Sequence, residues 1–342
     1  MRIATDNLRN PRWWVCAVLW TLTGAGLLAA ALLTPLHWID VSRPRLVEWA
    51  AFTPLGTPFA LGALLVGVIL VLVQRTRRPV AAALAVTSGL LLALHLWWLA
   101  PLYVGSRPTT SGRSLVVLSQ NFEYGDPTRL AELVRDEKVD VLVLTDLDSR
   151  RVSQLLATDI PQMLPNSIGT RPDQTISSVI FSRYRIDSVG SGPHSSHADL
   201  VRLHTPMLGD VDLVAVHPQP PYTVRWRPDY RALHAFLSSA VPQPRTRPTI
   251  VAGDFNATTD NVPFREVLDL GYTDAITQRR GGFQPTWPDS STVHHFGIPV
   301  PRLVTIDHVL LSGTVAASSA TTVHVPGADH RGVLVGVAHR GG

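Results

Sequence analysis

The sequence predicts a layered α/β or α+β domain that follows three membrane-spanning helices. Two observations predict it. From residue 114 onward, apolar runs of about six residues alternate with segments of amphipathic, helix-like pattern. Residues 1–103 are strongly apolar, whereas the remainder has the composition of a soluble domain. The chain has 342 residues, so a domain with a sizeable buried core follows the apolar part.

The apolar part contains three segments that each reach the roughly 20 residues needed to cross the hydrocarbon core of a membrane. Trp13 and Trp14 begin the first segment, and Trp97 and Trp98 lie near the end of the third, as in interfacial aromatic belts. A cleaved signal peptide is the alternative for the first segment, but two further spans follow and a good small-residue cleavage site is lacking. The predicted helices cover residues 13–35, 55–74 and 79–102.

The arginines around these segments predict an orientation. They precede the first span and fill the loop between the second and the third: Arg2, Arg9, Arg12, Arg75, Arg77 and Arg78. The positive-inside rule then places the N-terminus in the cytoplasm and everything after Tyr103 outside. His95 is the only acidic, basic or imidazole side chain in the three spans, which favours an anchor over a transport path. We expect a multi-pass protein of the cell membrane with an extracytoplasmic C-terminal domain.

The soluble part reads as a linker over residues 104–113 and a domain over residues 114–342. Asp126 is a predicted helix N-cap with Pro127 at the first helical position, and residues 227–237 form a second predicted helix. The predicted strands are apolar runs, most of which have a polar side chain at an end. They are Ser114–Ser119, Val139–Leu144, Ser177–Phe181, Val211–Val216, Thr249–Ala252, Val304–Leu311 and Val333–Val337.

Composition excludes several classes of function. The single cysteine, Cys16, excludes an intramolecular disulfide and a cysteine-based zinc site. The glycine-rich motifs that bind dinucleotides or nucleoside triphosphates are absent, and so are internal repeats. The net charge of +4 suits anionic partners, although arginines flanking the membrane account for much of it.

The most informative stretch is Gly253-Asp254-Phe255-Asn256, at the end of a buried strand. A carboxylate and an amide two residues apart share one face of an extended backbone. Together they suit a hard cation and a phosphate. Other predicted strands also end on polar groups, which adds Asn121, Asp146, His217, Asp307, Asp329 and His330.

These groups lie in six short motifs, whose order resembles that of the endonuclease/exonuclease/phosphatase superfamily. The motifs are Ser119-Gln120-Asn121, Leu144-Thr145-Asp146, Val216-His217-Pro218, Gly253-Asp254-Phe255-Asn256, Ile306-Asp307-His308 and Ala328-Asp329-His330. The resemblance covers residue 114 to the C-terminus. It implies a four-layer sandwich, in which two mixed β-sheets pack face to face and helices flank them.

The resemblance also implies a metal site. Asn121 and Asp146 correspond to the metal-binding pair of the family, which would hold Mg²⁺ or Mn²⁺, and Asp329 is the second acid on that side. The family usually has glutamate where this chain has Asp146, whose side chain is one methylene shorter. Asp148 or Glu123 would compensate in part; otherwise both are expected to be surface groups.

The remaining roles concern the phosphate and the attacking water. The resemblance implies that Asp254 orients or deprotonates the water, that Asn256 donates to a phosphate oxygen and that His330 contacts the phosphate. Asp307 would steer His330, and His217 would act near the leaving group, as a histidine can near neutral pH. Asn121 as a turn cap and His217 as an ordinary loop residue are the alternatives.

Three further residues have two interpretations each. Arg183 is a candidate for substrate phosphate binding, and a structural ion pair is the alternative. Trp287 is a candidate for stacking on the substrate, and ordinary packing is the alternative. His308, next to Asp307, is expected to pack or to face solvent. His294 and His295 are expected to be surface groups.

The sequence therefore predicts a membrane-anchored, divalent-metal-dependent phosphoesterase. Because His217 resembles the histidine of the nuclease and sphingomyelinase branches, the resemblance implies a phosphodiester substrate, either nucleic acid or a lipid-linked phosphodiester. The alternative is a catalytically degenerate member of the family, which binds a phosphorylated ligand or a protein partner through the same cleft. The change at Asp146 motivates this second hypothesis.

Overall fold

The structure is a computed structural model that describes most of the chain, in two compact units. One unit comprises residues 11–40 and 49–100, and the other comprises residues 43–48 and 101–341. Arg2 and Arg9, which entered the predicted orientation, lie outside the described residues. Those residues are 11–40, 43–170, 178–192, 198–240, 247–289, 294–295, 298–299 and 301–341.

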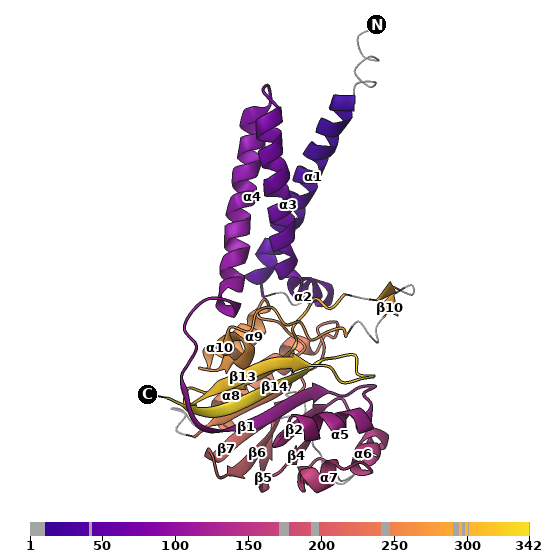
Figure 1. Cartoon of the computed structure of the whole chain (residues 1–342), viewed down its shortest axis with the longest axis vertical. Coiled ribbons are helices and arrows are strands. Elements are labelled where there is room, and N and C mark those ends of the chain that lie inside the picture. The colour runs from indigo at the N-terminus through magenta and orange to yellow at the C-terminus, as the bar shows by residue number, and fades with distance from the viewer. Residues whose placement is uncertain are drawn as a thin grey trace. The chain divides into compact units, whose positions relative to one another are not determined.

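The first unit consists of α1 (Pro11–Leu33), α3 (Gly56–Val73) and α4 (Arg78–Leu99), drawn in indigo and purple in Figure 1. Short 3₁₀ turns extend them, at Thr34–His37, Thr53–Leu55 and Ala100–Leu102. Three segments are long and apolar enough to cross a membrane, namely Trp13–His37, Thr53–Val73 and Arg78–Leu102. Large apolar side chains such as Leu72 and Leu90 are exposed along these helices. Apolar outer surfaces of this kind suit a lipid environment.

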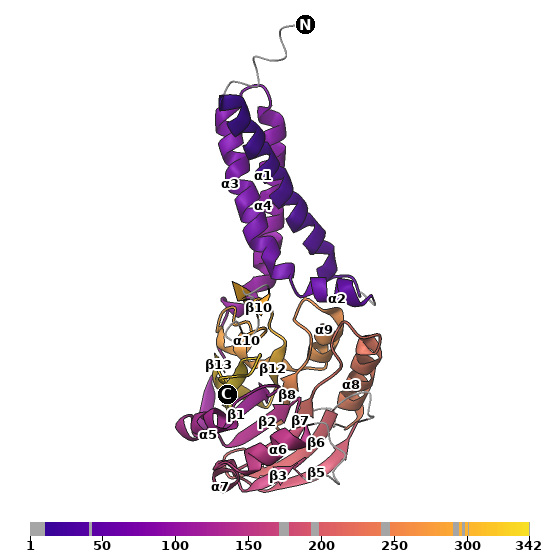
Figure 2. The same ribbon diagram turned by 90° about the vertical axis from the view of Figure 1, so that its right-hand side faces the viewer.

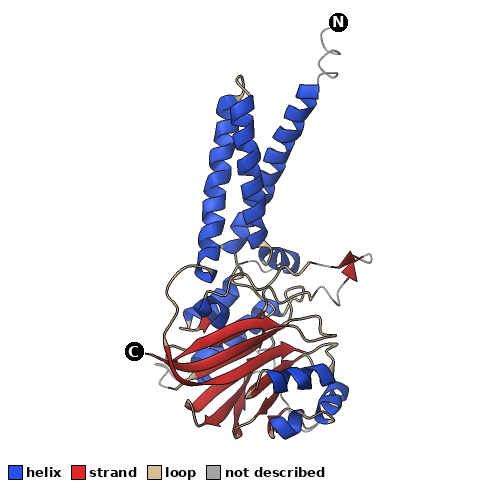
Figure 3. Cartoon of the chain, in the orientation of Figure 1, coloured by secondary structure: helices blue, strands red, loops and turns tan. Residues whose placement is uncertain are grey.

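The second unit contains two six-stranded sheets (Figure 3). The first has the order β13-β14-β1-β2-β4-β3, and the second β5-β6-β7-β8-β12-β9. The first sheet comprises β1 (Thr110–Asn121), β2 (Val141–Thr145), β3 (Asn166–Ile168), β4 (Val179–Ser182), β13 (Val315–Val323) and β14 (Gly332–Arg340). The second comprises β5 (Ile186–Ser191), β6 (Ala198–Thr205), β7 (Gly209–Val216), β8 (Thr249–Asp254), β9 (Thr273–Asp274) and β12 (Asp307–Leu311).

Helices flank the sheets, as Figure 2 shows. They are α5 (Pro127–Asp136), α6 (Ser149–Leu156), α7 (Ile160–Met163), α8 (Trp226–Ala240), α9 (Val262–Asp269) and α10 (Ala275–Arg279). A short helix, α2 (Pro44–Ala50), precedes α3, and β10 (His294–His295) pairs with β11 (Ile298–Pro299). Asp126 caps α5 as predicted, because its side chain accepts hydrogen bonds from the backbone N–H groups of Thr128 and Arg129.

The apolar side chains of the first sheet form two separate clusters, because alternate residues of a strand point to opposite faces. Val117 of β1 and Ala252 of β8 belong to one apolar cluster that both sheets share. Leu118 and Leu142, each one residue along its strand from a member of that cluster, belong to a second cluster with Leu130 of α5. Successive side chains of a strand point to opposite faces, so one face of the first sheet packs on the second sheet and the other on helices. The predicted sandwich of two mixed sheets flanked by helices is therefore confirmed.

Most strand boundaries differ from the prediction by one to three residues, and two differ for a clear reason. β1 begins at Thr110, within the predicted linker, because its first residues pair with the end of β14. β12 begins only at Asp307, because Val304 forms an isolated bridge with Trp287 instead. For the predicted strand Ser177–Phe181 the structure has β4, and Ser177 lies outside the described residues. Strands β5, β6 and β13 were not predicted, since polar residues interrupt their apolar pattern.

Candidate active site

Four of the candidate site residues lie at the carboxyl ends of two parallel strand pairs, one in each sheet. In the first sheet, β1 and β2 are parallel and Asn121 is paired with Thr145, so Asn121 and Asp146 emerge together. In the second sheet, β7 and β8 are parallel and Val216 is paired with Gly253, so His217 and Asp254 emerge together. The carboxyl ends of parallel strands meet at one edge of a sheet, which is where open α/β folds bind their ligands.

Gly253 allows β7 and β8 to approach closely at this edge. Its φ of +152° is a backbone conformation that side chains disfavour. An added Cβ atom at Gly253 would lie 1.9 Å from the carbonyl oxygen of Val216. Only glycine fits there, which explains why the buried strand runs into Gly253 directly before Asp254.

Strand register also decides which groups of β12 enter the site. Asp307 is paired with Asp254 across the antiparallel β8–β12 ladder, so both carboxylates lie on the same face. His308 is one residue further and faces the other way. Its Nδ1 lies 3.1 Å from Asp274 Oδ2, and its ring packs on Phe264 with centroids 4.3 Å apart. His308 is therefore a packed residue, as expected.

Asp254 is the centre of the site and is buried. Its Oδ2 accepts a hydrogen bond from Asn121 Nδ2 at 3.0 Å, and its Oδ1 accepts one from the backbone N–H of Asn256 at 2.7 Å. The Nε2 atoms of His217 and His330 lie 3.7 and 3.9 Å from Oδ2. Burial, followed by the charge of Asp307, raises the pKa of the Asp254 carboxyl, although the two imidazoles and the Asn256 N–H oppose that shift.

His330 and Asp307 form a buried pair. His330 Nδ1 lies 2.8 Å from Asp307 Oδ2, which leaves Nε2 facing Asp254. Burial lowers the pKa of His330, but the charges of Asp307 and Asp254 outweigh it and raise the pKa to about 10. His330 is therefore a cation at neutral pH. The Trp287 ring lies beside it, with centroids 6.4 Å apart.

Asn256 sits on a tight turn after β8, with a φ of +49°. Its Nδ2 donates to the carbonyl oxygen of Pro218 at 3.0 Å, so one amide proton remains for another acceptor. The indole of Trp226 donates to the Asn256 carbonyl, and the hydroxyl of Tyr230 donates to the Phe255 carbonyl at 2.6 Å. Two side chains of helix α8 thus hold the turn in place.

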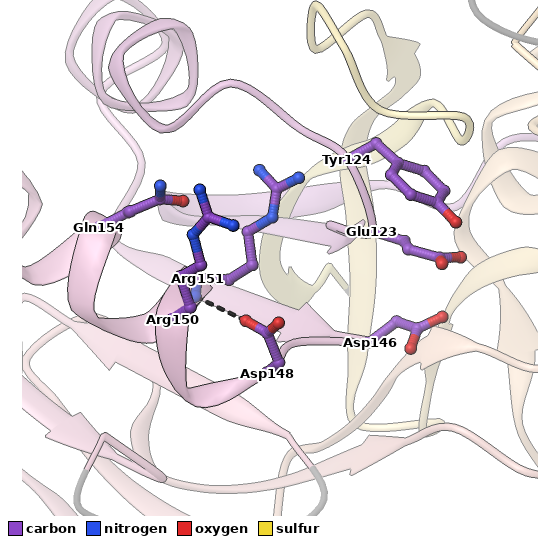
Figure 4. A pocket seen from close by; sticks show the side chains of 7 residues that line it. All are labelled: Glu123, Tyr124, Asp146, Asp148, Arg150, Arg151 and Gln154. Carbon is purple, nitrogen blue, oxygen red and sulfur yellow. Dashed lines mark hydrogen bonds between the residues drawn. The ribbon is translucent and has the colours of Figure 1, made fainter.

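A pocket of about 420 Å³ opens beside the ends of β1 and β2 (Figure 4). Asp146 is exposed in it, on a left-handed backbone with a φ of +58°. Aspartate is several-fold enriched in that conformation, which gives a local reason for its presence here. A hydrogen bond to Glu123, with the charges of Glu123, Asp329 and Asp146, raises the pKa of the Tyr124 phenol. The lining residues are Glu123, Tyr124, Asp146, Asp148, Arg150, Arg151 and Gln154.

Two acidic residues that line the pocket, Asp148 and Glu123, were expected at the surface, and the structure gives them different surroundings. Asp148 is the N-cap of α6, because its Oδ1 accepts a hydrogen bond from the Arg151 N–H at 2.7 Å. Glu123 lines the pocket beside Asp146; from the sequence it was expected only as one of two acids that would compensate in part for the shorter Asp146. The available signal was its position two residues after Asn121, at the end of a buried strand.

Arg183 is not brought to the site. It follows Ser182, which pairs with Val141 at the start of β2, whereas Asp146 follows the end of β2. Its Nε donates to Asp140 Oδ1 at 2.9 Å, and its Nη2 donates to the Val139 carbonyl at 3.1 Å. The buried Asp140 carboxylate needs this cation, so the alternative interpretation of Arg183 as a structural ion pair is the one the structure supports.

The donor set at the pocket suits a hard divalent cation. Asn121 and Asp146 offer amide and carboxylate oxygens, which Mg²⁺ and Mn²⁺ prefer. Asp329 Oδ1 is buried without a hydrogen-bond partner, as expected of a ligand atom. Ligand atoms of Asp254, Asp307 and His330 also lie within 4.8 Å of one another. In that group His330 Nδ1 already bonds to Asp307 Oδ2, whereas the pocket offers the exposed carboxylate of Asp146.

Comparison with known proteins agrees with this geometry. The sequence profile of the Endonuclease/Exonuclease/phosphatase family matches residues 117–330. The chain belongs to the endonuclease/exonuclease/phosphatase family. Enzymes of this family are phosphoesterases that depend on a divalent metal.

Solved structures of the endonuclease/exonuclease/phosphatase family share the fold. The family protein from Bacteroides vulgatus is 15% identical, covers 67% of this chain and 100% of its own, and has a TM-score of 0.51. TDP2 from C. elegans is 17% identical, covers 79% of this chain and 83% of its own, and has a TM-score of 0.51. The family protein from Beutenbergia cavernae is 20% identical, covers 67% and 72%, and has a TM-score of 0.48. No curated protein sequence matches the chain.

Proposed function

We propose that this protein is a membrane-anchored phosphodiesterase that requires a divalent metal and acts on the extracytoplasmic side. The observation that carries the proposal is the buried network around Asp254. An aspartate there accepts hydrogen bonds from Asn121 and Asn256 and faces the imidazoles of His217 and His330. The desolvation of so many polar groups is costly, and it is typical of a site built for chemistry.

Asp254 is the candidate that orients and deprotonates the attacking water. Its two hydrogen bonds, to different oxygens, fix the plane of the carboxylate. Burial and the nearby Asp307 raise its pKa, which makes it a stronger base than an exposed aspartate. A water bound to Asp254 would then face a phosphate that His330 and Asn256 hold.

His330 and Asn256 are the candidates that bind the phosphate. The positive charge of His330 and the remaining amide proton of Asn256 both stabilise the negative charge that grows on the phosphate in the transition state. Asp307 acts as a positioning residue, because its bond to Nδ1 directs Nε2 of His330 into the site. Trp287 packs beside His330 and is placed to contact a substrate.

His217 is the candidate that protonates the leaving oxygen. It is partly exposed and reaches Asp254 Oδ2 at 3.7 Å. An alkoxide leaving group needs such a proton donor, so His217 supports a diester substrate. Asn121, Asp146 and Asp329 would hold Mg²⁺ or Mn²⁺, which polarises a phosphoryl oxygen when it is bound.

The substrate is proposed as a nucleic acid or a lipid-linked phosphodiester. Tyr222 and Arg225 are exposed on the loop that leads into α8, where they can contact bases or lipid headgroups, although Arg225 Nε also lies 4.0 Å from Asp229 Oδ1. Arg227 on the same stretch is paired with Glu266 at 2.8 Å and is unavailable. The three apolar helices favour a substrate at or near the membrane.

The arginines at positions 75, 77 and 78 support the proposed orientation, with the phosphoesterase domain outside. An alkaline phosphatase fusion after residue 341 tests it, since that reporter is active only outside the cytoplasm. A fusion to green fluorescent protein, which fluoresces only inside, is the complementary control. Fluorescence without phosphatase activity contradicts the orientation and leaves the chemistry untouched.

The activity is tested with the full chain in detergent micelles and bis(p-nitrophenyl) phosphate, with Mg²⁺ or Mn²⁺. We expect turnover that is lost with a chelator and falls by roughly 10²–10⁴ in Asp254→Asn. Asp210→Asn is the matched control, because Asp210 is the second residue of β7, at the end away from the site, and pairs with His204. No turnover with either metal contradicts the enzyme, and metal binding without turnover supports the degenerate alternative.

A further inference from the structure

We propose that Glu123 is a further ligand of the divalent metal, which it would hold together with Asn121, Asp146 and Asp329. This inference rests on the proposed function, which places the metal at the ends of β1 and β2. Figure 4 shows the carboxylates of Glu123 and Asp146 side by side and pointing the same way from neighbouring strand ends.

The backbone fixes this neighbourhood. Asn121 is the last residue of β1 and pairs with Thr145, the last residue of β2. The strands stay joined one step further, because the Phe122 N–H donates to the Thr145 carbonyl at 3.0 Å. The Glu123 N–H then donates to Asn121 Oδ1 at 3.2 Å. Glu123 is therefore held next to both proposed ligands by its own main chain.

Reach explains why two carboxylates are needed. Asp146 is one methylene shorter than the glutamate usual in the family, and its left-handed backbone leaves it exposed at the mouth of the pocket. Glu123 has the longer side chain and enters from the adjacent strand end. Magnesium demands near-ideal octahedral geometry, so a second carboxylate on the same side compensates for the shorter first one.

The charges around the pocket also call for a cation. Among the described residues, neither Glu123 nor Asp146 forms an ion pair with an arginine or lysine. Arg150 and Arg151 line the same pocket, and Arg151 Nη1 donates to the Gly125 carbonyl at 2.8 Å. Asp329 Oδ1 is buried without a hydrogen-bond partner. Glu123 and Asp146 therefore form a pair of carboxylates that a divalent cation would neutralise.

Asp148 is the natural rival, since it lines the pocket and carries the same charge. It is engaged differently, because its Oδ1 accepts the first free N–H of α6, from Arg151. Asp148→Asn therefore removes one negative charge from the pocket and keeps a good N-cap. It is the matched control for Glu123→Gln, which removes the same charge from the proposed ligand.

The test is Mn²⁺ binding to the full chain in detergent micelles, measured by electron paramagnetic resonance of free Mn²⁺. We expect Glu123→Gln and Asp146→Asn each to weaken Mn²⁺ binding by about tenfold or more, and Asp148→Asn to change it by less than about threefold. In the double variant Glu123→Gln/Asp146→Glu we expect affinity to return toward that of the unaltered protein, because one longer carboxylate then replaces two. This gain also shows that Glu123→Gln does not act by unfolding the chain.

Two results overturn the inference and leave the proposed function standing. One is Glu123→Gln binding Mn²⁺ as tightly as the unaltered chain while Asp146→Asn does not. The other is Asp148→Asn weakening binding as much as Glu123→Gln, which shows that only the net charge matters. If the unaltered chain itself binds no Mn²⁺, the proposed function fails together with the inference.

Discussion

Gly253→Ala is the substitution whose outcome follows most directly from the geometry. The added Cβ atom would lie 1.9 Å from the Val216 carbonyl oxygen and 2.9 Å from its carbonyl carbon. Since non-bonded atoms repel steeply below their contact distance, β7 and β8 must separate locally by about 1 Å or more. The φ of +152° adds strain of its own, because an alanine side chain disfavours that conformation.

Both effects have known magnitudes. Overpacking a tight site costs roughly 1–3 kcal/mol, and a residue in a sparsely populated backbone region costs roughly 1–3 kcal/mol. We therefore expect the free energy of unfolding of the domain to fall by about 2–6 kcal/mol, a large part of a typical total of about 5–15 kcal/mol. Asp254 follows Gly253 and His217 follows Val216, so the same shift displaces the two groups and lowers kcat by about 10²-fold.

The assay is urea unfolding of the full chain in detergent micelles, followed by hydrogen exchange of peptides that cover β7 and β8. Exchange reports on this domain separately from the apolar helices. Gly313→Ala is the matched control, because a Cβ atom at Gly313 would meet nothing within 4 Å. If Gly253→Ala unfolds within about 0.5 kcal/mol of the unaltered protein, as surface substitutions do, the argument from close approach is wrong.

Three further outcomes are expected. His330 has a pKa raised to about 10 in the folded protein, so the stability that its pair with Asp307 contributes is complete below about pH 6.5 and is lost as the pH rises toward 10. Urea unfolding at pH 6, 8 and 10 checks this, and Asp307→Asn should abolish the alkaline loss; an unchanged loss in that variant contradicts the assignment. Arg183→Met should lower the free energy of unfolding by about 1–2 kcal/mol, because it leaves the Asp140 carboxylate buried and unpaired, while kcat/KM stays within about twofold. If kcat/KM falls tenfold instead, Arg183 binds the substrate and the ion-pair interpretation is wrong. Trp287→Ala should raise KM for the diester several-fold with little change in kcat, measured by initial rates, and an unchanged KM shows that Trp287 only packs.

The sequence alone was sufficient for the apolar helices, for most strands that reach the site, and for the family. An apolar run that ends on a polar group is local information, and so is the cap that Asp126 makes on α5. The order of six such motifs needed no structure, because each is read from a few adjacent residues. The segments 13–35, 55–74 and 79–102 correspond to three helices long and apolar enough to cross a membrane.

Only the tertiary structure decided how these groups combine, because their partners are distant in the chain. Asp307 and His308 are neighbours, yet the β8–β12 register sends one toward Asp254 and the other toward Asp274. Pairing of β4 with β2 likewise brings Arg183 to Asp140, at the end of β2 away from the site.

Glu123 is the clearest case of this division. In the sequence it is an acid two residues after Asn121, and nothing there separates it from Asp148 as the acid that would compensate for Asp146. Parallel pairing of β1 with β2 brings it beside Asp146, across 23 positions of the chain. Local patterns determine which residues end a strand, whereas strand pairing determines which of those ends share a site.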